Sequence, residues 1–245
     1  MVAVIDLRQG RYQSALSDVR CDVMHADPPY SDETHAGHDA GVIAAGDAAG
    51  DAARESLDYE FWTPDDVREF VAWATARTEW WLIAQTDEVL APVYREAIKA
   101  AGWLPFATIP WIARRKRHLG DGPPSWMCHI VVGRPRHRRY FNGWHHLVGA
   151  YDIPQDRDSG IGGKPRALIM RLLTDYTRRL SDPLVCDPTS GERPTTALAC
   201  RELGLRFVGA EARPEAHAKA MDLLAQPYTA PLLIDAPDAT QEALL

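Results

Sequence analysis

Residues 184–211 read LVCDPTSGERPTTALACRELGLRFVGAE, and this stretch is the clearest indication of fold class in the chain. A short apolar run ends at Asp187, a glycine-containing turn follows, and residues 194–203 have helical spacing. After a glycine stop, a second apolar run ends at Glu211. Apolar runs that alternate with helical patterns predict a parallel sheet with helices on both faces.

The same alternation extends through most of the 245 residues, which is the length of one domain. We predict further strands at 2–7, 21–26, 80–84, 104–113 and 127–132, and further helices starting at 63 and covering 88–101, 165–179 and 214–225. The predicted fold class is therefore α/β, with a mostly parallel, doubly wound sheet. Residues 31–56 are rich in Ala, Gly and Asp, and we expect a mobile loop there.

The composition is that of a globular protein, with 46% hydrophobic and 25% charged residues. No apolar run approaches the roughly 18 residues of a membrane-spanning helix, and we expect a cytoplasmic location with no membrane partner. The four cysteines are scattered without a CxxC pair, so we expect reduced, buried thiols and no metal site. The sequence leaves the oligomeric state open.

The charge is distributed unevenly along the chain. The net charge is −7, but residues 113–139 carry +7 and the remainder −14. The basic residues of that segment are Arg114, Arg115, Lys116, Arg117, Arg134, Arg136, Arg138 and Arg139. A basic patch on an acidic body is typical of a protein that docks a polyanion on one face. A solvated charged loop is the alternative interpretation.

The tetrapeptide Asp27-Pro28-Pro29-Tyr30 directly follows a predicted strand. Two prolines fix the backbone and remove two amide donors, which leaves carbonyl oxygens as acceptors beside a carboxylate. Such a rigid, acceptor-only group suits the recognition of an NH₂ group, and Tyr30 adds a flat face for stacking. The alternative is an ordinary strand-ending turn, in which Asp and Pro are common.

With Asp27-Pro28-Pro29-Tyr30, the chain resembles the amino-methylating DNA methyltransferases, whose catalytic signature is [DNS]PP[YFW]. The segment from Asp187 to Thr196, followed by 208–211, resembles their cofactor motif DPFxGSGTT…GxE, and Gly163-Lys164-Pro165 resembles the end of their HPTQKP segment. The order, with the catalytic motif first and the cofactor motif last, is that of the circularly permuted class called beta. The resemblance covers residues 2–225 and implies a single Rossmann-like domain of 1–245, with a small basic insertion at 113–146 for DNA recognition.

The resemblance implies a role for each motif. Asp27 and the Pro28 carbonyl would accept hydrogen bonds from the exocyclic amino group of a flipped base, and Tyr30 would stack on that base. Double-stranded DNA would be the partner, held by the eight basic residues given above, and S-adenosylmethionine the cofactor, with no metal required. Cofactor contacts are implied for Asp187, Pro188, Thr189, Ser190, Gly191, Thr195, Thr196, Glu211, Lys164 and Pro165.

The cofactor turn departs from the family pattern. The usual Gly-x-Gly spacing becomes Gly191-Glu192-Arg193-Pro194, with one extra residue and no second glycine. We expect these side chains to reshape the pocket, and Pro194 to be the first helical residue. The leading hypothesis is a site-specific adenine-N6 methyltransferase of restriction-modification type, since DPP is commoner among adenine enzymes. Cytosine-N4 methylation, another substrate such as RNA or a small amine, and a catalytically degenerate DNA-binding module are the alternatives.

Overall fold

The computed structural model describes residues 4–36, 60–114, 125–138, 146–155 and 164–227. Its centre is a seven-stranded sheet in the order β1-β7-β6-β2-β3-β5-β4. The strands are β1 (Ile5–Gln9), β2 (Cys21–Ala26), β3 (Thr78–Thr86), β4 (Leu104–Arg114), β5 (Ser125–Arg134), β6 (Leu184–Asp187) and β7 (Arg206–Glu211).

Neighbouring strands from β1 to β3 pair in parallel, whereas β5 is antiparallel to both β3 and β4. The prediction of a mostly parallel sheet is thereby confirmed. The antiparallel pairing of β5 was not part of that prediction, because strand direction depends on tertiary pairing and leaves no mark on hydrophobic periodicity.

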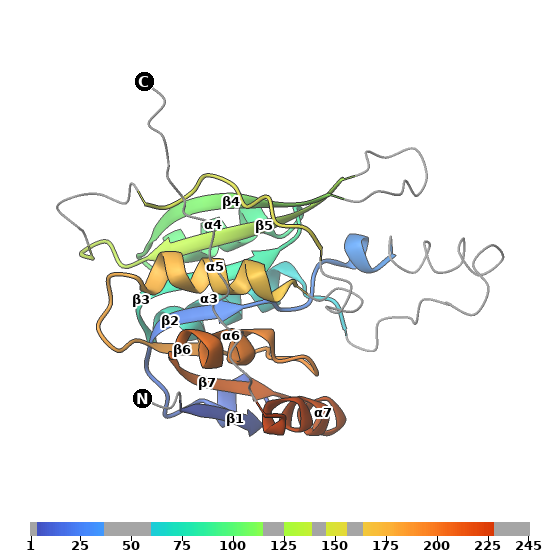
Figure 1. The fold of residues 1–245 in the computed structure, drawn as a ribbon. Helices are drawn as coiled ribbons and strands as arrows, with labels where there is room; N and C mark the ends of the chain where they lie inside the picture. The colour runs from blue at the N-terminus through green and yellow to red at the C-terminus, as the bar shows by residue number, and fades with distance from the viewer. Residues whose placement is uncertain (1–3, 37–59, 115–124, 139–145, 156–163, 228–245) are drawn as a thin grey trace.

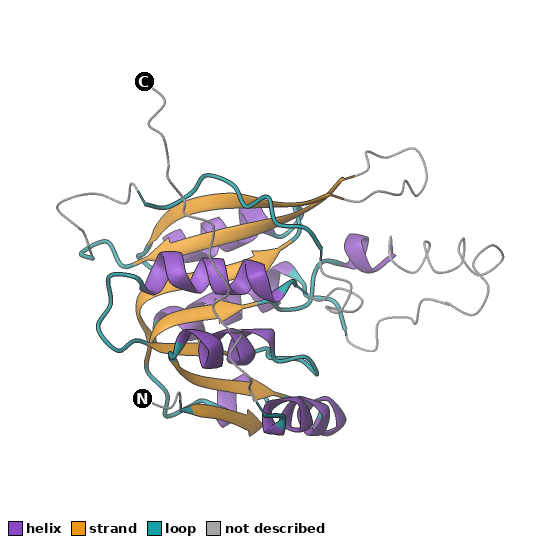
Figure 2. Ribbon diagram, in the orientation of Figure 1, coloured by secondary structure: helices purple, strands orange, loops and turns teal. Residues whose placement is uncertain are grey.

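Helices cover both faces of the sheet (Figures 1 and 2). The helices include α1 (Tyr12–Ala15), α3 (Pro64–Thr75), α4 (Ala91–Ala100), α5 (Arg166–Thr177), α6 (Thr195–Leu203) and α7 (Pro214–Ala225). One apolar core packs α5, α6 and α7 against one face, and a second packs α3, α4 and the α1 region against the other. This is the doubly wound arrangement that the alternating pattern predicts.

The local helix signals are confirmed in the structure. Thr63 caps α3, accepting from the Asp66 amide, while the Asp66 side chain accepts from the Thr63 amide. Gly204 ends α6 with a left-handed φ of 70°. The prediction for Pro194 is wrong by one position: it is the cap residue of α6, and its carbonyl accepts from the Leu198 amide. The single-turn helix α1 was not predicted because it buries no residue and so shows no apolar periodicity.

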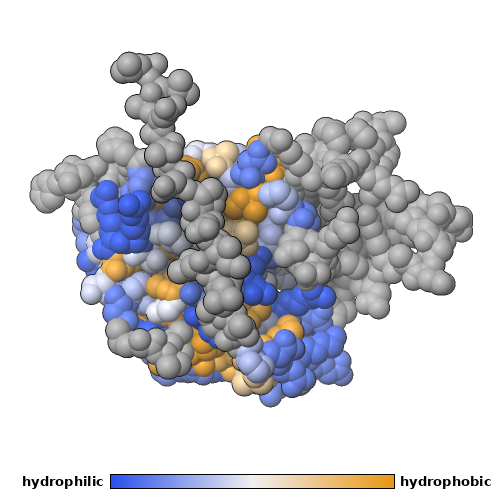
Figure 3. All heavy atoms as spheres, viewed as in Figure 1, coloured by the Kyte–Doolittle hydropathy of each residue, from blue (hydrophilic) through white to orange (hydrophobic). Residues whose placement is uncertain are grey.

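Two features of the surface and the core follow from this packing. All four cysteines are free and buried, as expected. The exposed large hydrophobic residues Val4, Phe61, Val89 and Met221 come from separate parts of the chain, and in the coloured part of Figure 3 apolar areas are interspersed with polar ones. None of the described helices is long and apolar enough to cross a membrane.

The structure changes the description of the two segments that were expected to be irregular. Residues 32–36 at the start of the expected loop are helical, whereas 37–59 lie outside the described residues. Within the segment 113–146, residues 125–134 form β5, which lies between β3 and β4 in the sheet, and 115–124 and 139–145 lie outside the described residues. Its expected role in DNA recognition stays a prediction.

Candidate active site

Three acidic residues lie at the ends of adjacent parallel strands. Asp27 directly follows β2, Asp187 ends β6 and Glu211 ends β7. The register pairs Met24 with Cys186, and Asp187 with Gly209, so these strand ends lie at one edge of the sheet, on the right in Figure 1. Ligands of doubly wound sheets bind at this edge, which makes it the candidate site.

Asp27 is held by a lysine from a distant part of the chain. The Lys164 Nζ lies 2.8 Å from Asp27 Oδ1 and 2.7 Å from Oδ2. The lysine side chain is 4% exposed and that of Asp27 is 27% exposed, so the pair closes the inner side of the carboxylate and leaves part of it accessible. The expected contact of Lys164 was with the cofactor, whereas its described contacts are with Asp27 and Tyr30.

Tyr30 is fixed on several sides. Its hydroxyl lies 3.0 Å from Cys128 Sγ on β5 and donates to Asp27 Oδ1 at 3.4 Å. The Lys164 ammonium lies 4.8 Å from the ring centroid, a cation–π distance. Burial raises the pKa of Tyr30 well above its ordinary value, so the phenol is neutral and remains a donor.

The loop after Tyr30 is tied to the start of α4. Asp87 Oδ2 accepts from the Ser31 amide at 2.8 Å, from the Ser31 hydroxyl at 2.5 Å and from the Thr34 hydroxyl at 2.6 Å. The Trp62 amide donates to the Tyr30 carbonyl at 2.9 Å. These contacts fix the backbone on the far side of the two prolines.

The turn after β6 is closely packed against the next strand. The Ser190 amide donates to the Ala210 carbonyl at 3.0 Å, and the Ser190 hydroxyl to the Asp187 carbonyl at 3.1 Å. A Cβ at Gly209 would lie 2.6 Å from Ser190 Oγ and 2.9 Å from the Asp187 carbonyl oxygen. The absence of a side chain at Gly209 is therefore what lets this turn fold onto β7.

Glu211 connects this turn to α7. Its Oε2 accepts from the Gly191 amide at 2.9 Å, and its Oε1 accepts from the Arg213 amide at 2.9 Å. Gly191 has a φ of +67°, a conformation that favours glycine. The expected crowding by Glu192 takes another form: its carboxylate pairs with Lys219 of α7 at 2.8 Å, near the surface.

Asp187 is a buried carboxylate of unusual basicity. Its pKa is raised to about 7, mainly by burial and also by the charges of Asp27 and Glu211, while Thr196 and the Thr189 amide act in the opposite direction. No described basic side chain forms an ion pair with Asp187. Asp27 and Glu211 are already paired with Lys164 and Arg213, so Asp187 is the one of the three carboxylates that can face a cationic ligand. S-adenosylmethionine is such a ligand, since it carries a sulfonium and an ammonium. The residues present thus fit that cofactor.

The expected DNA-binding residues are divided between the two ends of a hairpin. Strand β4 ends at Arg114, on the side of Asp27, and Arg115, Lys116 and Arg117 lie outside the described residues, as does Arg139. Arg134 ends β5 at the opposite end, roughly 30 Å away for a strand of this length. Among the described residues, Arg134, Arg136 and Arg138 therefore form a far group that is separate from the end of β4 at Arg114.

The described arginines of the far group have partners within the protein. Arg134 lies over the Phe106 ring at 5.5 Å. Arg138 pairs with Glu79 at 3.0 Å and lies over Trp80 at 4.4 Å. Arg136 is exposed. These contacts give Arg134 and Arg138 a structural role at this end of the sheet.

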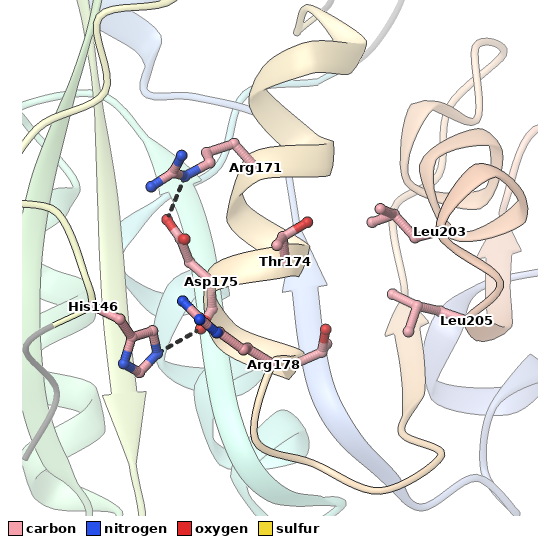
Figure 4. A pocket seen from close by; sticks show the side chains of 8 residues that line it. His146, Arg171, Thr174, Asp175, Arg178, Leu203 and Leu205 are labelled. Atoms are coloured by element: carbon pink, nitrogen blue, oxygen red, sulfur yellow. Dashed lines mark hydrogen bonds and ion pairs between the residues drawn. The ribbon is translucent and has the colours of Figure 1, made fainter. Parts of the chain in front are cut away.

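A second hollow lies away from the acidic edge. A cavity of about 370 Å³ is lined by residues from the C-terminal ends of α5 and α6 and by His146 (Figure 4). Within it, Arg171 pairs with Asp175 at 3.1 Å, and His146 contacts the Asp175 carbonyl at 3.1 Å. Helices α5 and α6 begin at the edge of the sheet that carries Asp27 and end at the other edge. The cavity lies at their C-terminal ends and is therefore separate from the site at Asp27.

Sequence reasoning missed two polar residues beneath the site, His25 and Gln85. His25 is 1% exposed on β2 and Gln85 is 0% exposed on β3. The available signal was a polar residue inside an apolar strand run, since buried polar side chains need specific partners. Among the described residues, no group of three His, Cys, Asp or Glu side chains is arranged to hold a metal ion.

The fold can be compared with the folds of solved structures. A seven-stranded, mostly parallel sheet with an antiparallel strand between β3 and β4 matches solved S-adenosylmethionine-dependent methyltransferases. No protein-family model and no curated protein sequence matches the chain.

Three solved structures illustrate the likeness. The M1.HpyAVI–SAM complex is 15% identical with a TM-score of 0.62, covering 90% of this chain and 100% of that one. A Thermus thermophilus protein described as a DNA modification methylase was solved in complex with S-adenosyl-L-methionine. It is 16% identical with a TM-score of 0.60, and the match covers 91% of this chain and 93% of that one. The PvuII DNA methyltransferase, specific for cytosine N4, is 12% identical with a TM-score of 0.59, covering 89% and 86%. At these identities the likeness establishes the fold.

Proposed function

We propose that this chain is an S-adenosylmethionine-dependent DNA methyltransferase that modifies an exocyclic amino group, with adenine N6 as the target. The observation that carries the proposal is the position of Asp27 and the Asp187 turn at the ends of adjacent strands β2 and β6. An amino-group acceptor and a site suited to a cationic methyl donor thus share one edge of the sheet. Of the proteins of similar fold named above, the PvuII enzyme is a DNA methyltransferase specific for cytosine N4, and the Thermus thermophilus protein is described as a DNA modification methylase.

In the proposed reaction, Asp27 and the Pro28 carbonyl accept hydrogen bonds from the target amino group and orient its lone pair toward the methyl. The bound cofactor would supply that methyl from its sulfonium. Lys164 donates to both Asp27 oxygens and Tyr30 donates to Oδ1, so Oδ2 is the oxygen that can accept a further hydrogen bond from the target amino group. Catalysis then consists of positioning and electrostatics.

Tyr30 is the proposed stacking surface for the flipped base. A base cannot present its amino nitrogen while it remains in the duplex, so it must be swung out. The Lys164 ammonium lies over one face of the Tyr30 ring. A base that stacks on that face would therefore take the place of the ammonium over the ring. The hydrogen bond between the Tyr30 hydroxyl and Cys128 holds the ring in place during this exchange.

The decisive experiment combines two measurements on the intact protein. Calorimetric titration with S-adenosylmethionine tests cofactor binding, and absence of heat at millimolar ligand contradicts the proposal. Mass spectrometry of nucleosides from plasmid incubated with protein and cofactor identifies the product. N6-methyladenine as the product supports the proposal. N4-methylcytosine would show that the target is cytosine, as it is for the PvuII enzyme.

The pH dependence of cofactor binding follows from Asp187. Its pKa of about 7 in the free protein means that the carboxylate is mostly protonated at pH 6 and mostly ionised at pH 8. A cationic ligand binds the ionised form, so we expect the affinity for S-adenosylmethionine to rise about tenfold between these pH values. Titrations at both pH values measure the change.

Asp187→Asn is the control for this pH prediction, because it also corrects for titration of the ligand's own amino group. We expect the variant to bind more weakly at pH 8 and to lose most of the difference between the two pH values. Equal affinity of the wild-type protein at pH 6 and pH 8 would rule out the proposed role of the carboxylate.

DNA binding is expected to depend on the basic residues at the end of β4 and directly after it in the sequence. Replacing Arg114, Arg115 and Arg117 by alanine should weaken duplex binding and reduce the slope of log affinity against log salt by about three. Arg136→Ala is the matched control, since this exposed arginine lies at the other end of the hairpin. Unchanged affinity and slope in the triple variant would favour RNA or a small amine as the substrate.

A further inference from the structure

A chain of buried polar side chains links three elements beneath the site. The Gln85 Nε2 of β3 lies 2.9 Å from the His25 Nε2 of β2. The other imidazole nitrogen, Nδ1, lies 3.0 Å from the Thr196 Oγ1 in the first turn of α6. None of these three residues is more than 3% exposed.

The direction of each hydrogen bond in this series follows from the contact at its Asp187 end. Thr196 lowers the pKa of the Asp187 carboxyl, which indicates that its hydroxyl proton is directed at that carboxylate. With that proton engaged, Thr196 Oγ1 accepts from His25, and Nδ1 carries the imidazole hydrogen. The Nε2 lone pair then accepts from the Gln85 amide. In this arrangement every step from Gln85 to Asp187 joins a donor to an acceptor.

The histidine is electrically neutral in this setting. Burial, together with the nearby Lys164 charge, lowers its pKa to about 3. Asp187 lies beyond Thr196, and the carboxylate of Asp27 is already paired with Lys164. His25 therefore has the character of a fixed spacer with one donor and one acceptor, and not that of a proton carrier.

We infer that His25 is a positioning residue for the proposed methyl transfer, which sets the distance between the Asp27 loop and the cofactor turn. The inference rests on the proposed function. His25 is two residues before Asp27, and Thr196 follows the turn that begins at Asp187, so the hydrogen bond spans the two halves of the site. A displacement of about 1 Å between reacting groups can lower a rate about a hundredfold.

Two conservative replacements separate this role from simple packing. The Asn side-chain amide reaches the place of Nδ1, so His25→Asn retains a donor for Thr196. The Gln amide reaches the place of Nε2, so His25→Gln retains the Gln85 contact and loses the Thr196 contact. We expect kcat to fall at least about tenfold in His25→Gln and less than about threefold in His25→Asn, with cofactor Kd nearly unchanged in both.

A second pair of variants tests whether the two residues act together. Thr196→Val should lower kcat at least as much as His25→Gln, because it also removes the hydroxyl that acts on Asp187, and the double variant should be no worse than Thr196→Val alone. Thr196→Ser should retain most of the activity because it keeps the hydroxyl. Additive losses in the double variant, or equal losses in His25→Asn and His25→Gln, would overturn the inference.

A measurement without cofactor keeps this test separate from the proposed function. Nitrogen-15 NMR of the ligand-free protein should show His25 protonated at Nδ1 and neutral at pH 5. An Nε2-protonated or a charged imidazole contradicts the hydrogen-bond chain, whatever the activity. If the hydrogen-bond chain is observed but the wild-type protein binds no S-adenosylmethionine, the binding result contradicts the proposed function. The positioning role of His25 is then also wrong, because it rests on that function.

Discussion

Asp27→Ala is expected to abolish methyl transfer, with a loss of about a thousandfold or more, while cofactor binding changes little. The variant removes the carboxylate that would accept from the target amino group and that offsets the charge of the Lys164 ammonium at the same place. A cation there opposes the positive charge that develops on the attacking nitrogen. Both effects act on the chemical step, so kcat falls and the Kd for S-adenosylmethionine is retained.

The matched control for this experiment is Asp32→Ala. Asp32 is an exposed carboxylate in the helical turn after Tyr30 and its side-chain contact is with the adjacent Glu33 amide. We expect this variant to have wild-type activity in the tritiated-methyl incorporation assay. If Asp27→Ala methylates DNA at the wild-type rate, the catalytic assignment is wrong. If neither protein methylates but both bind DNA, the degenerate DNA-binding module becomes the better hypothesis.

Gly209→Ala is expected to have the second largest effect, through the cofactor turn. The new Cβ would lie 2.9 Å from the Asp187 carbonyl oxygen and 2.6 Å from Ser190 Oγ, closer than such contacts normally allow. The serine hydroxyl can rotate, but the carbonyl belongs to the backbone of the turn. Relief of the contact should displace that turn, lower the free energy of unfolding by about 1–3 kcal/mol, and weaken cofactor binding at least about tenfold.

Gly149→Ala provides the comparison for this second prediction. A Cβ at Gly149 meets no atom within 4 Å, so the free energy of unfolding and the cofactor affinity should both stay close to wild type. Urea denaturation and calorimetric titration measure the two quantities. Wild-type cofactor affinity in Gly209→Ala would show that the Asp187 turn does not form the cofactor site.

The predicted elements and the observed ones agree because helix and strand periodicity are local properties. The strand at 21–26 and the helix at 214–225 have the predicted bounds, and Thr63 caps its helix as expected. The positions of Asp27, Asp187 and Glu211 could also be inferred, because all parallel strands of such a sheet present their carboxyl ends at the same edge.

The contacts that give the site its chemistry could not be inferred in this way. Lys164 pairs with Asp27 across 137 residues, and His25 bonds to Thr196 across 171. The separation of Arg134 from Arg114 depends on β4 and β5 forming a long hairpin. Strand order, register and strand direction arise from the packing of distant segments, and composition near each residue carries no record of them.

The amino-acid pattern alone was therefore enough to specify the α/β architecture and the strand ends that carry the acidic residues. The close approach of the Asp187 turn to Gly209, the pairing of Lys164 with Asp27, the buried link through His25 and the separation of Arg134 from Arg114 became visible only in the folded protein. The physical reason is that periodicity and turn chemistry act over a few residues, whereas ion pairs and buried hydrogen bonds are selected by three-dimensional proximity and loss of solvent.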